Sequence, residues 1–179
     1  MLVGMVISAS VDFLAAILPA GPYIVELSVS SMTTIIKVAD LDLAVLQRLR
    51  AESLREGFKF IERLCQEWSS GANQFNACVE ALFEAVAGGQ VVGICGLNSD
   101  PYAHERRVGR VRRLYVLPAY RRVGVGRALL DAVIAHARGR FDLLRVRTDR
   151  ADGFYAAYGF RRDISGTDAT HILDLTSID

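Results

Sequence analysis

Two glycines stand one residue apart in the stretch RRVGVGRALL, residues 121–130, and an apolar helical pattern follows them directly. Glycine inside a helix costs about 1 kcal/mol relative to alanine. Because glycine has no Cβ, this cost is explained if a ligand must approach the backbone closely at this point. The start of a helix also exposes unpaired N–H groups and about half a positive charge, which together attract phosphate. Because Arg121, Arg122 and Arg127 surround the glycines, the stretch predicts a pyrophosphate-binding loop.

Two other phosphate-binding motifs are excluded by the same stretch. A P-loop requires a Gly-Lys-Ser/Thr sequence, which the chain lacks. A dinucleotide-binding loop requires a third glycine at position 129, where this chain has leucine.

The charges are divided unequally along the chain. Residues 1–100 carry a net charge of −5 and residues 101–179 a net charge of +6. The basic half also contains the glycine pair, so this asymmetry favours an anionic ligand there. A composition that is 51% hydrophobic and 23% charged is typical of a globular chain.

The length of 179 residues predicts one folded domain, which we place at residues 32–179. Residues 1–31 contain no Lys or Arg, and we expect them to form a nonessential extension or an added edge strand. They lack the positive start of a secretory signal, and charged residues and prolines interrupt any membrane-spanning run. The three cysteines have no CxxC spacing, which predicts free thiols in a reducing cytoplasm and no metal site.

Hydrophobic periodicity and turn residues predict the order β-α-α-β-β-β-α-β-α-β-β. The expected strands are residues 33–39, 81–87, 90–97, 108–117, 143–148, 160–164 and 169–175. The expected helices are one capped by Asp40, one over 58–68, one from the glycine stretch to about Arg138, and one over 152–158. Alternating hairpins and helical crossovers predict an α/β (α+β) fold with a mixed sheet and helices on both faces.

Two phrases of the sequence resemble the signatures of the GNAT superfamily of N-acetyltransferases. The phrase LYVLPAYRRVGVGRALL (114–130) matches the acetyl-CoA signature Arg/Gln-x-x-Gly-x-Gly/Ala, with Arg121 in the leading position, and FYAAYGF (154–160) matches Phe-Tyr-x-x-x-Gly-Phe. The phrases occur in the family's order, with a predicted strand between them. The resemblance implies a GNAT-like mixed, mostly antiparallel central sheet flanked by helices on both faces.

The resemblance also implies a binding mode for acetyl-CoA. Backbone N–H groups from Arg122 to Arg127 would hold the pyrophosphate, and the end of the preceding strand would bind the pantetheine arm. That strand would bulge and splay from its neighbour, which opens a slot for the thioester. The implied cofactor-binding residues are Leu114, Tyr115, Val116, Arg121, Arg122, Val123, Gly124, Val125, Gly126 and Arg127.

The resemblance assigns Tyr155 as the acid that protonates the departing thiolate, the family's usual role for this tyrosine. The general base is not identified by the sequence. Many relatives place a glutamate on the long strand before the Tyr-Val phrase, where this chain has glycine and arginines. Glu84, Asp100, His104 and Glu105 lie on nearby strands or loops and remain candidates, and a relay of water molecules is an alternative.

The sequence therefore predicts a cytoplasmic enzyme that moves acetyl from acetyl-CoA to a primary amine of a small molecule or peptide, without a metal. Family members often form homodimers. A non-catalytic acyl-CoA-binding module is the first alternative. A nucleic-acid-binding protein is a weaker one, based on five arginines in HERRVGRVRR (104–113), because no aromatic stacking platform accompanies them. We expect no nucleic-acid or membrane partner, and the arginines could equally attract CoA or an acidic acceptor.

Overall fold

The computed structural model describes residues 33–103, 107–164 and 168–176, and the predicted order of elements is confirmed. The extension over residues 1–31, with its alternative edge strand, lies outside the described residues. The strands are β1 (Thr33–Lys37), β2 (Ala81–Ala87), β3 (Gln90–Ser99), β4 (Val108–Val116), β5 (Leu143–Val146), β6 (Arg161–Arg162) and β7 (His171–Asp174). The helices are α1 (Gln47–Arg55), α2 (Phe60–Ser70), α3 (Val125–Ala137) and α4 (Asp152–Ala156), with a 3₁₀ turn at Pro118–Tyr120.

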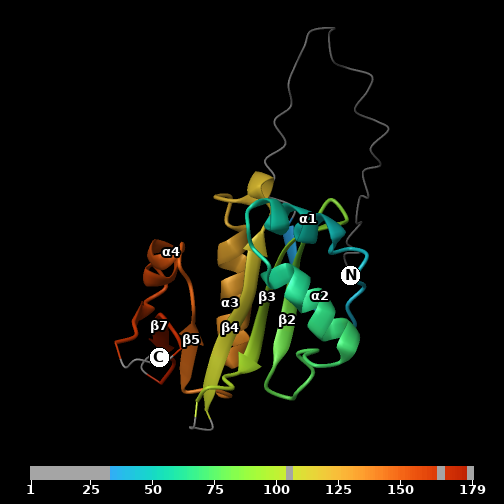
Figure 1. The fold of residues 1–179 in the computed structure, drawn as a ribbon. Coiled ribbons are helices and arrows are strands. Elements are labelled where there is room, and N and C mark those ends of the chain that lie inside the picture. Colours follow the sequence, from blue (N-terminus) through green and yellow to red (C-terminus); the bar gives the residue numbers. More distant parts are fainter. Residues whose placement is uncertain (1–32, 104–106, 165–167, 177–179) are drawn as a thin grey trace, which may run out of the picture.

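The described strands form one seven-stranded sheet in the order β1-β2-β3-β4-β5-β7-β6. Neighbouring strands run antiparallel, except for the parallel pair β4–β5. Figure 1 shows α1 and α2 on one side of the sheet and α3 on the other. The predicted mixed, mostly antiparallel sheet with helices on both faces is therefore confirmed.

Two glycines of β3 show which helix packs on each face of the sheet. A Cβ atom at Gly93 would meet Leu129 of α3, whereas one at Gly96 would meet the ring of Phe75, which follows α2. Residues three apart in a strand point to opposite faces. α3 therefore packs on the Gly93 face and α2 on the Gly96 face, which we call the α2 face.

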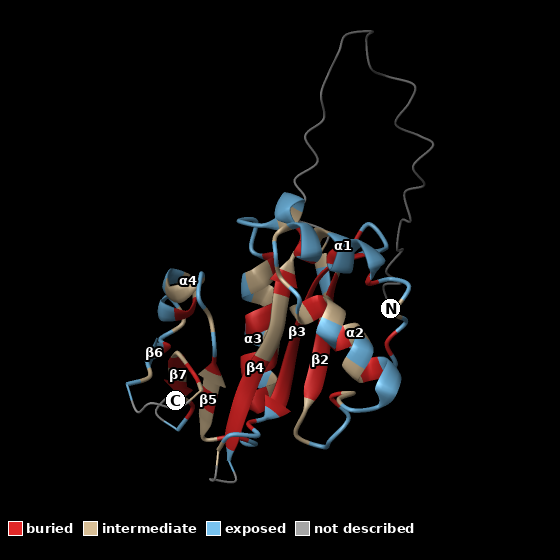
Figure 2. Cartoon of the chain, in the orientation of Figure 1, coloured by how far each residue is buried: buried red, intermediate tan, exposed pale blue. Residues whose placement is uncertain are grey.

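The core lies on both faces of the central strands, beneath α3 on one side and beneath α1 and α2 on the other. Every residue of β3 from Val91 to Asn98 is buried, as expected for a strand covered on both faces, and Figure 2 shows this burial in β2, β3 and β4. The buried residues of α3 recur at intervals of three and four and include Leu129, Val133 and Ala137, so one stripe of the helix faces the sheet.

The first helix begins later than predicted. Asp40 does not cap it; α1 begins at Gln47, and its N-cap is Leu46. The Asp42 carboxylate accepts a hydrogen bond from the Ala44 N–H at 2.9 Å, so this acidic side chain stabilises a local turn. Short polar side chains compete in this way with helix formation. The helical stripe seen in the sequence therefore extends over a run of turns before the helix proper.

Candidate active site

β4 bends away from β5 partway along its length. The two strands pair only from Val108 to Arg110, while β4 continues to Val116. The register of β4 against β3 shifts opposite Cys95, and Arg113 there has a φ of 62°. A β-bulge of this kind bends its strand and increases the twist. The bulge and the splay expected from the resemblance are thus present, and beyond Arg110 the edge of β4 pairs with no strand among the described residues.

The glycine loop connects this free edge to α3. Gly124 is the N-cap of α3, with a φ of 93° and no side-chain cap. Apart from its chain neighbours, no described residue has an atom within 4 Å of where its Cβ would stand. A left-handed backbone favours glycine, so Gly124 shapes the turn. At Gly126 a Cβ would meet Val116 and Phe154 at ordinary distances of 3.7 and 3.8 Å. The protein's own packing therefore leaves room at both positions.

Arg121 is held by a carboxylate that the sequence did not single out. Its Nη atoms bond to Glu56 at 2.7 and 2.6 Å, and its Nε donates to the Val116 carbonyl at 2.8 Å. The Tyr115 hydroxyl donates to the same Glu56 carboxylate at 2.6 Å. Glu56 directly follows α1, so this cluster ties the end of α1 to the end of β4 and the start of the loop.

The cluster fixes the charge state of its members. The hydrogen bond from Arg121 is the main cause that lowers the pKa of Glu56 to about 2. Burial, followed by the hydrogen bond to Glu56, raises the pKa of Tyr115. At neutral pH Glu56 is therefore an anion and Tyr115 is neutral. No sequence signal marks Glu56, because it lies 65 residues from Arg121 along the chain.

Tyr155 lies in α4 and is only 4% exposed. Its ring centroid is 5.2 Å from that of Phe154, 5.3 Å from Phe160 and 6.5 Å from His171. Burial, with a smaller contribution from the Cys95 thiol, raises the pKa of its hydroxyl. Tyr155 is therefore protonated at neutral pH, and its hydroxyl bonds to none of the described residues.

α4 packs against the first turn of α3. The Tyr158 hydroxyl donates to the Arg127 carbonyl at 2.9 Å, and the Arg127 guanidinium lies 5.7 Å from the Tyr158 ring centroid. The structure thus brings the second phrase of the sequence beside the glycine loop. The Cys95 thiol, which contributes to the raised pKa of Tyr155, lies opposite the shift in the β4 register.

The base candidates do not converge on this point. Asp100 is buried and ion-paired with two arginines, so it is structural. Glu84, whose pKa is raised mainly by burial, lies on β2, two strands away from β4. His104 and Glu105 lie outside the described residues. Glu56 touches Tyr115, but a pKa of about 2 makes it a weak base near neutral pH.

Comparison with known proteins identifies the fold family. The model of an acetyltransferase (GNAT) domain matches residues 79–162. A crystal structure of a protein assigned as an acetyltransferase, from Exiguobacterium sp. 255-15, has 34% sequence identity and a TM-score of 0.73, and the match covers 80% of this chain and 94% of that one. The chain belongs to the GNAT superfamily.

Other GNAT relatives support the same assignment. N-alpha-acetyltransferase RimI of Mycobacterium tuberculosis is 35% identical over 99 residues, which cover 48% of this chain and 60% of RimI. The chain spans 60% and 64% of the lengths of the curated relatives it matches. A Brucella melitensis GNAT acetyltransferase solved in complex with acetyl-CoA has 20% identity and a TM-score of 0.61, over 79% of this chain and 87% of that one. It shares the fold.

None of the helices within the described ranges is long and apolar enough to cross a membrane.

Proposed function

We propose that this chain is an N-acetyltransferase that moves acetyl from acetyl-CoA directly to a primary amine, within one domain over residues 32–179. The proposal rests on one observation: an open strand edge and a helix N-terminus follow one another directly at the end of β4. After Arg110, one edge of β4 pairs with no described strand, and it leads into a helix N-terminus that is capped by Gly124. A strand edge binds amide groups and a helix N-terminus binds phosphate, and acetyl-CoA carries both in one chain.

The proposed cofactor contacts divide into two groups. Backbone groups of Leu114, Tyr115 and Val116 would pair with the pantetheine arm, and N–H groups from 122–127 would hold the pyrophosphate. Arg122 and Arg127 are exposed and add positive charge beside the loop. We assign Arg121 a different part, because its guanidinium is already bound by Glu56: it holds the loop in shape.

The proposed reaction is a direct acyl transfer. The neutral amine attacks the thioester carbonyl carbon, a C–N bond forms, and the C–S bond breaks. The Val116 N–H would stabilise the oxyanion. Tyr155 would give its proton to the departing thiolate, and the attacking nitrogen would lose a proton to water or to a base. The raised pKa of Tyr155 supports its role as an acid, because the hydroxyl stays protonated at neutral pH.

An amine-panel assay tests the proposal. The protein is incubated with acetyl-CoA and a panel of free amino acids, polyamines and peptides, and products are identified by a mass increase together with free-thiol release. Acetylation of an amine at a rate above that of the reaction without enzyme is the expected result. Acetyl-CoA binding without turnover on any amine would favour the non-catalytic acyl-CoA-binding module instead.

Cytoplasmic location, a homodimer and the absence of nucleic-acid partners remain predictions. The arginine-rich segment offers fewer free charges than its sequence indicates. Arg107 pairs with Asp142, Arg110 with Asp168 and Arg113 with Glu67. These pairs reduce the charge available to a polyanion, so the structure lends the nucleic-acid alternative no further support.

A further inference from the structure

β4 carries, on the face that α2 covers, an arginine whose side chain has no bonding partner among the described residues. Arg112 pairs across the strands with Gly96, and directly opposed residues point to the same face, so Arg112 lies on the α2 face. Its neighbours are compensated: Arg113 bonds to Glu67 at 2.7 Å, and Arg110 to Asp168 at 2.7 Å. The Arg112 side chain makes no hydrogen bond or ion pair with any described residue.

Because Arg112 is partly buried, the lack of a bonding partner is energetically costly for its guanidinium. The side chain is partly buried, and its Nε is enclosed with no hydrogen-bond partner within the described ranges. Burial is the main cause that lowers its pKa, and the positive charges of Arg113 and Arg110 lower it further, while Glu67 and Tyr102 offset only part of this decrease. A partly buried guanidinium beside two others is stabilised by an anion. The chain thus holds a site for a negative charge.

This site belongs to the acceptor side of the proposed active site. The bulge at Arg113 brings Arg112 onto the same face as Tyr115, since their partners on β3, Gly96 and Ile94, are two residues apart. That spacing is ~7 Å at about 3.3 Å per residue. The phosphates of acetyl-CoA would bind at the glycine loop, beyond Val116 at the C-terminal end of β4. An anion at Arg112 would therefore come from the molecule that meets the thioester from the α2 face.

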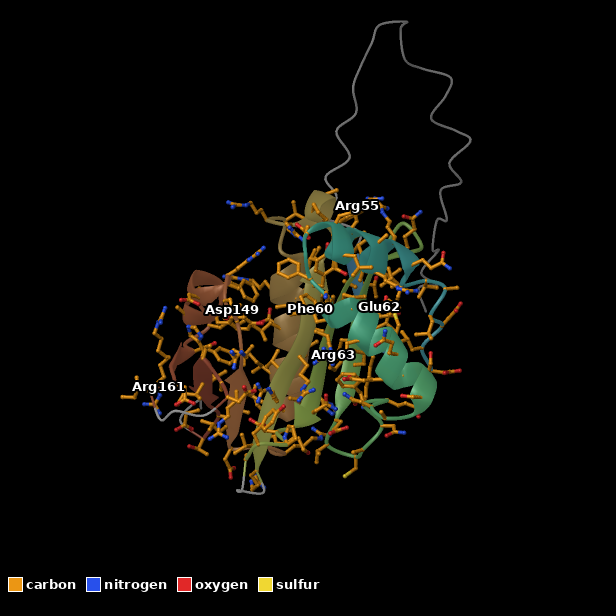
Figure 3. The ribbon with its side chains drawn as sticks, in the orientation of Figure 1. Arg55, Phe60, Glu62, Arg63, Asp149 and Arg161 are labelled. Atoms are coloured by element: carbon orange, nitrogen blue, oxygen red, sulfur yellow. The ribbon has the colours of Figure 1, made fainter. Side chains whose placement is uncertain are left out.

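α2 presents toward the same region a second arginine that is unpaired within the described part of the chain. Phe60, Arg63 and Glu67 are spaced by three and four residues and share one face of α2. The Phe60 ring centroid is 6.0 Å from that of Tyr115, and Glu67 bonds to Arg113, so this face is turned to β4. Figure 3 shows Phe60 and Arg63 on this side of α2. Arg63 is exposed and makes no side-chain bond to a described residue, so it stands at the rim.

We infer that the acceptor is an amine that also carries a carboxylate, and that this carboxylate pairs with Arg112, with Arg63 at the rim of the site. The inference rests on the proposed acetyl transfer and names its substrate class. Arginine and carboxylate form two parallel charge-assisted hydrogen bonds, which would both compensate Arg112 and orient the amine toward the thioester.

Matched pairs of acceptors test this directly. We would measure kcat/KM with β-alanine against β-alaninamide, and with alanyl-aspartyl amide against alanyl-asparaginyl amide, each at the same concentration of unprotonated amine. The first pair represents a free amino acid and the second a peptide N-terminus. In at least one pair the carboxylate should be preferred about tenfold, or ~1.4 kcal/mol. The pair that shows the preference identifies the source of the carboxylate.

Variants then assign the preference to the site. Arg112→Gln should reduce the ratio to near one, Arg112→Lys should retain part of it, and Arg63→Gln should lower it about threefold. Arg161→Gln is the matched control, because Arg161 is exposed on β6 at the far edge of the sheet, and the ratio should stay at the wild-type value.

Two results would overturn the inference: a wild-type protein that acetylates amines without preferring the carboxylate in either pair, or an Arg112→Gln variant that keeps the wild-type ratio. If Arg112→Gln does not fold, the wild-type ratio and the Arg63→Gln variant decide. Failure to acetylate any amine of the wider panel would refute the proposed function itself.

Discussion

The most informative stability test is Glu56→Gln. Glu56 accepts two hydrogen bonds from Arg121 and one from Tyr115, and it thereby ties α1 to the end of β4. Glutamine preserves the size of the side chain and removes its charge. We expect the variant to fold and to be less stable, because the Arg121 guanidinium loses its anionic partner.

The magnitude follows from the pKa of Glu56. A decrease from the ordinary value of 4.5 to about 2 corresponds to ~3 kcal/mol, at about 1.4 kcal/mol per unit of pKa. The Glu56 side chain is 28% exposed, and solvent screening weakens an ion pair at such a site. We therefore expect the free energy of unfolding to fall by about 1–2 kcal/mol at neutral pH.

The pH dependence gives the sharper test. The folded pKa lies below the ordinary value of 4.5, so the carboxylate stabilises the fold above that pH, and the stabilisation is lost as the pH falls toward 2. The difference between wild type and Glu56→Gln should thus be constant near neutrality and shrink below pH 4.5. Urea unfolding followed by the fluorescence of Trp68, the single tryptophan, measures it.

Glu52→Gln is the matched control for this experiment. Glu52 lies in α1, which Glu56 directly follows, and it pairs with Arg55 at the surface, an interaction that contributes little. Its loss should cost less than about 0.5 kcal/mol. A Glu56→Gln variant no less stable than Glu52→Gln, or a difference that persists unchanged in acid, would refute the stabilising role of the Glu56 cluster.

Three further predictions concern the loop, the acid and the domain. Gly124→Glu and Gly126→Glu should each abolish acetyl-CoA binding measured by calorimetry. Of the two alanine variants, only Gly124→Ala should destabilise the protein, by about 1–2 kcal/mol, because Gly124 has a left-handed φ of 93° and Gly126 does not. Tyr155→Phe should lower kcat about 100-fold with little change in acetyl-CoA affinity. The control Tyr158→Phe loses a hydrogen bond to α3, so it should be less stable but keep its rate. A Tyr155→Phe variant with the wild-type rate would refute the role of Tyr155 as the acid. A chain starting at Met32 should bind acetyl-CoA as the full chain does, and loss of binding would show that residues 1–31 complete the fold.

The sequence by itself determined the order of elements and the two phrases that identify the family. These features depend on local rules: alternation in strands, intervals of three and four in helices, and glycine where the backbone turns. Gly124 illustrates this, because its left-handed φ of 93° is a property of one residue. The start of α1 was less predictable, since a turn closed by Asp42 competed with the helical pattern.

Tertiary structure decided how the site is charged. Glu56 and Arg121 meet only because α1 ends beside β4, although 65 residues separate them in the chain. The bulge at Arg113 and the pairing of its guanidinium with Glu67 likewise depend on how α2 packs over the sheet. In the sequence, Arg110, Arg112 and Arg113 are equivalent basic residues. Packing places a carboxylate in an ion pair with Arg110 and another with Arg113, whereas no carboxylate of the described residues bonds to Arg112. A run of like charges in the sequence does not indicate which partners the fold will place beside it.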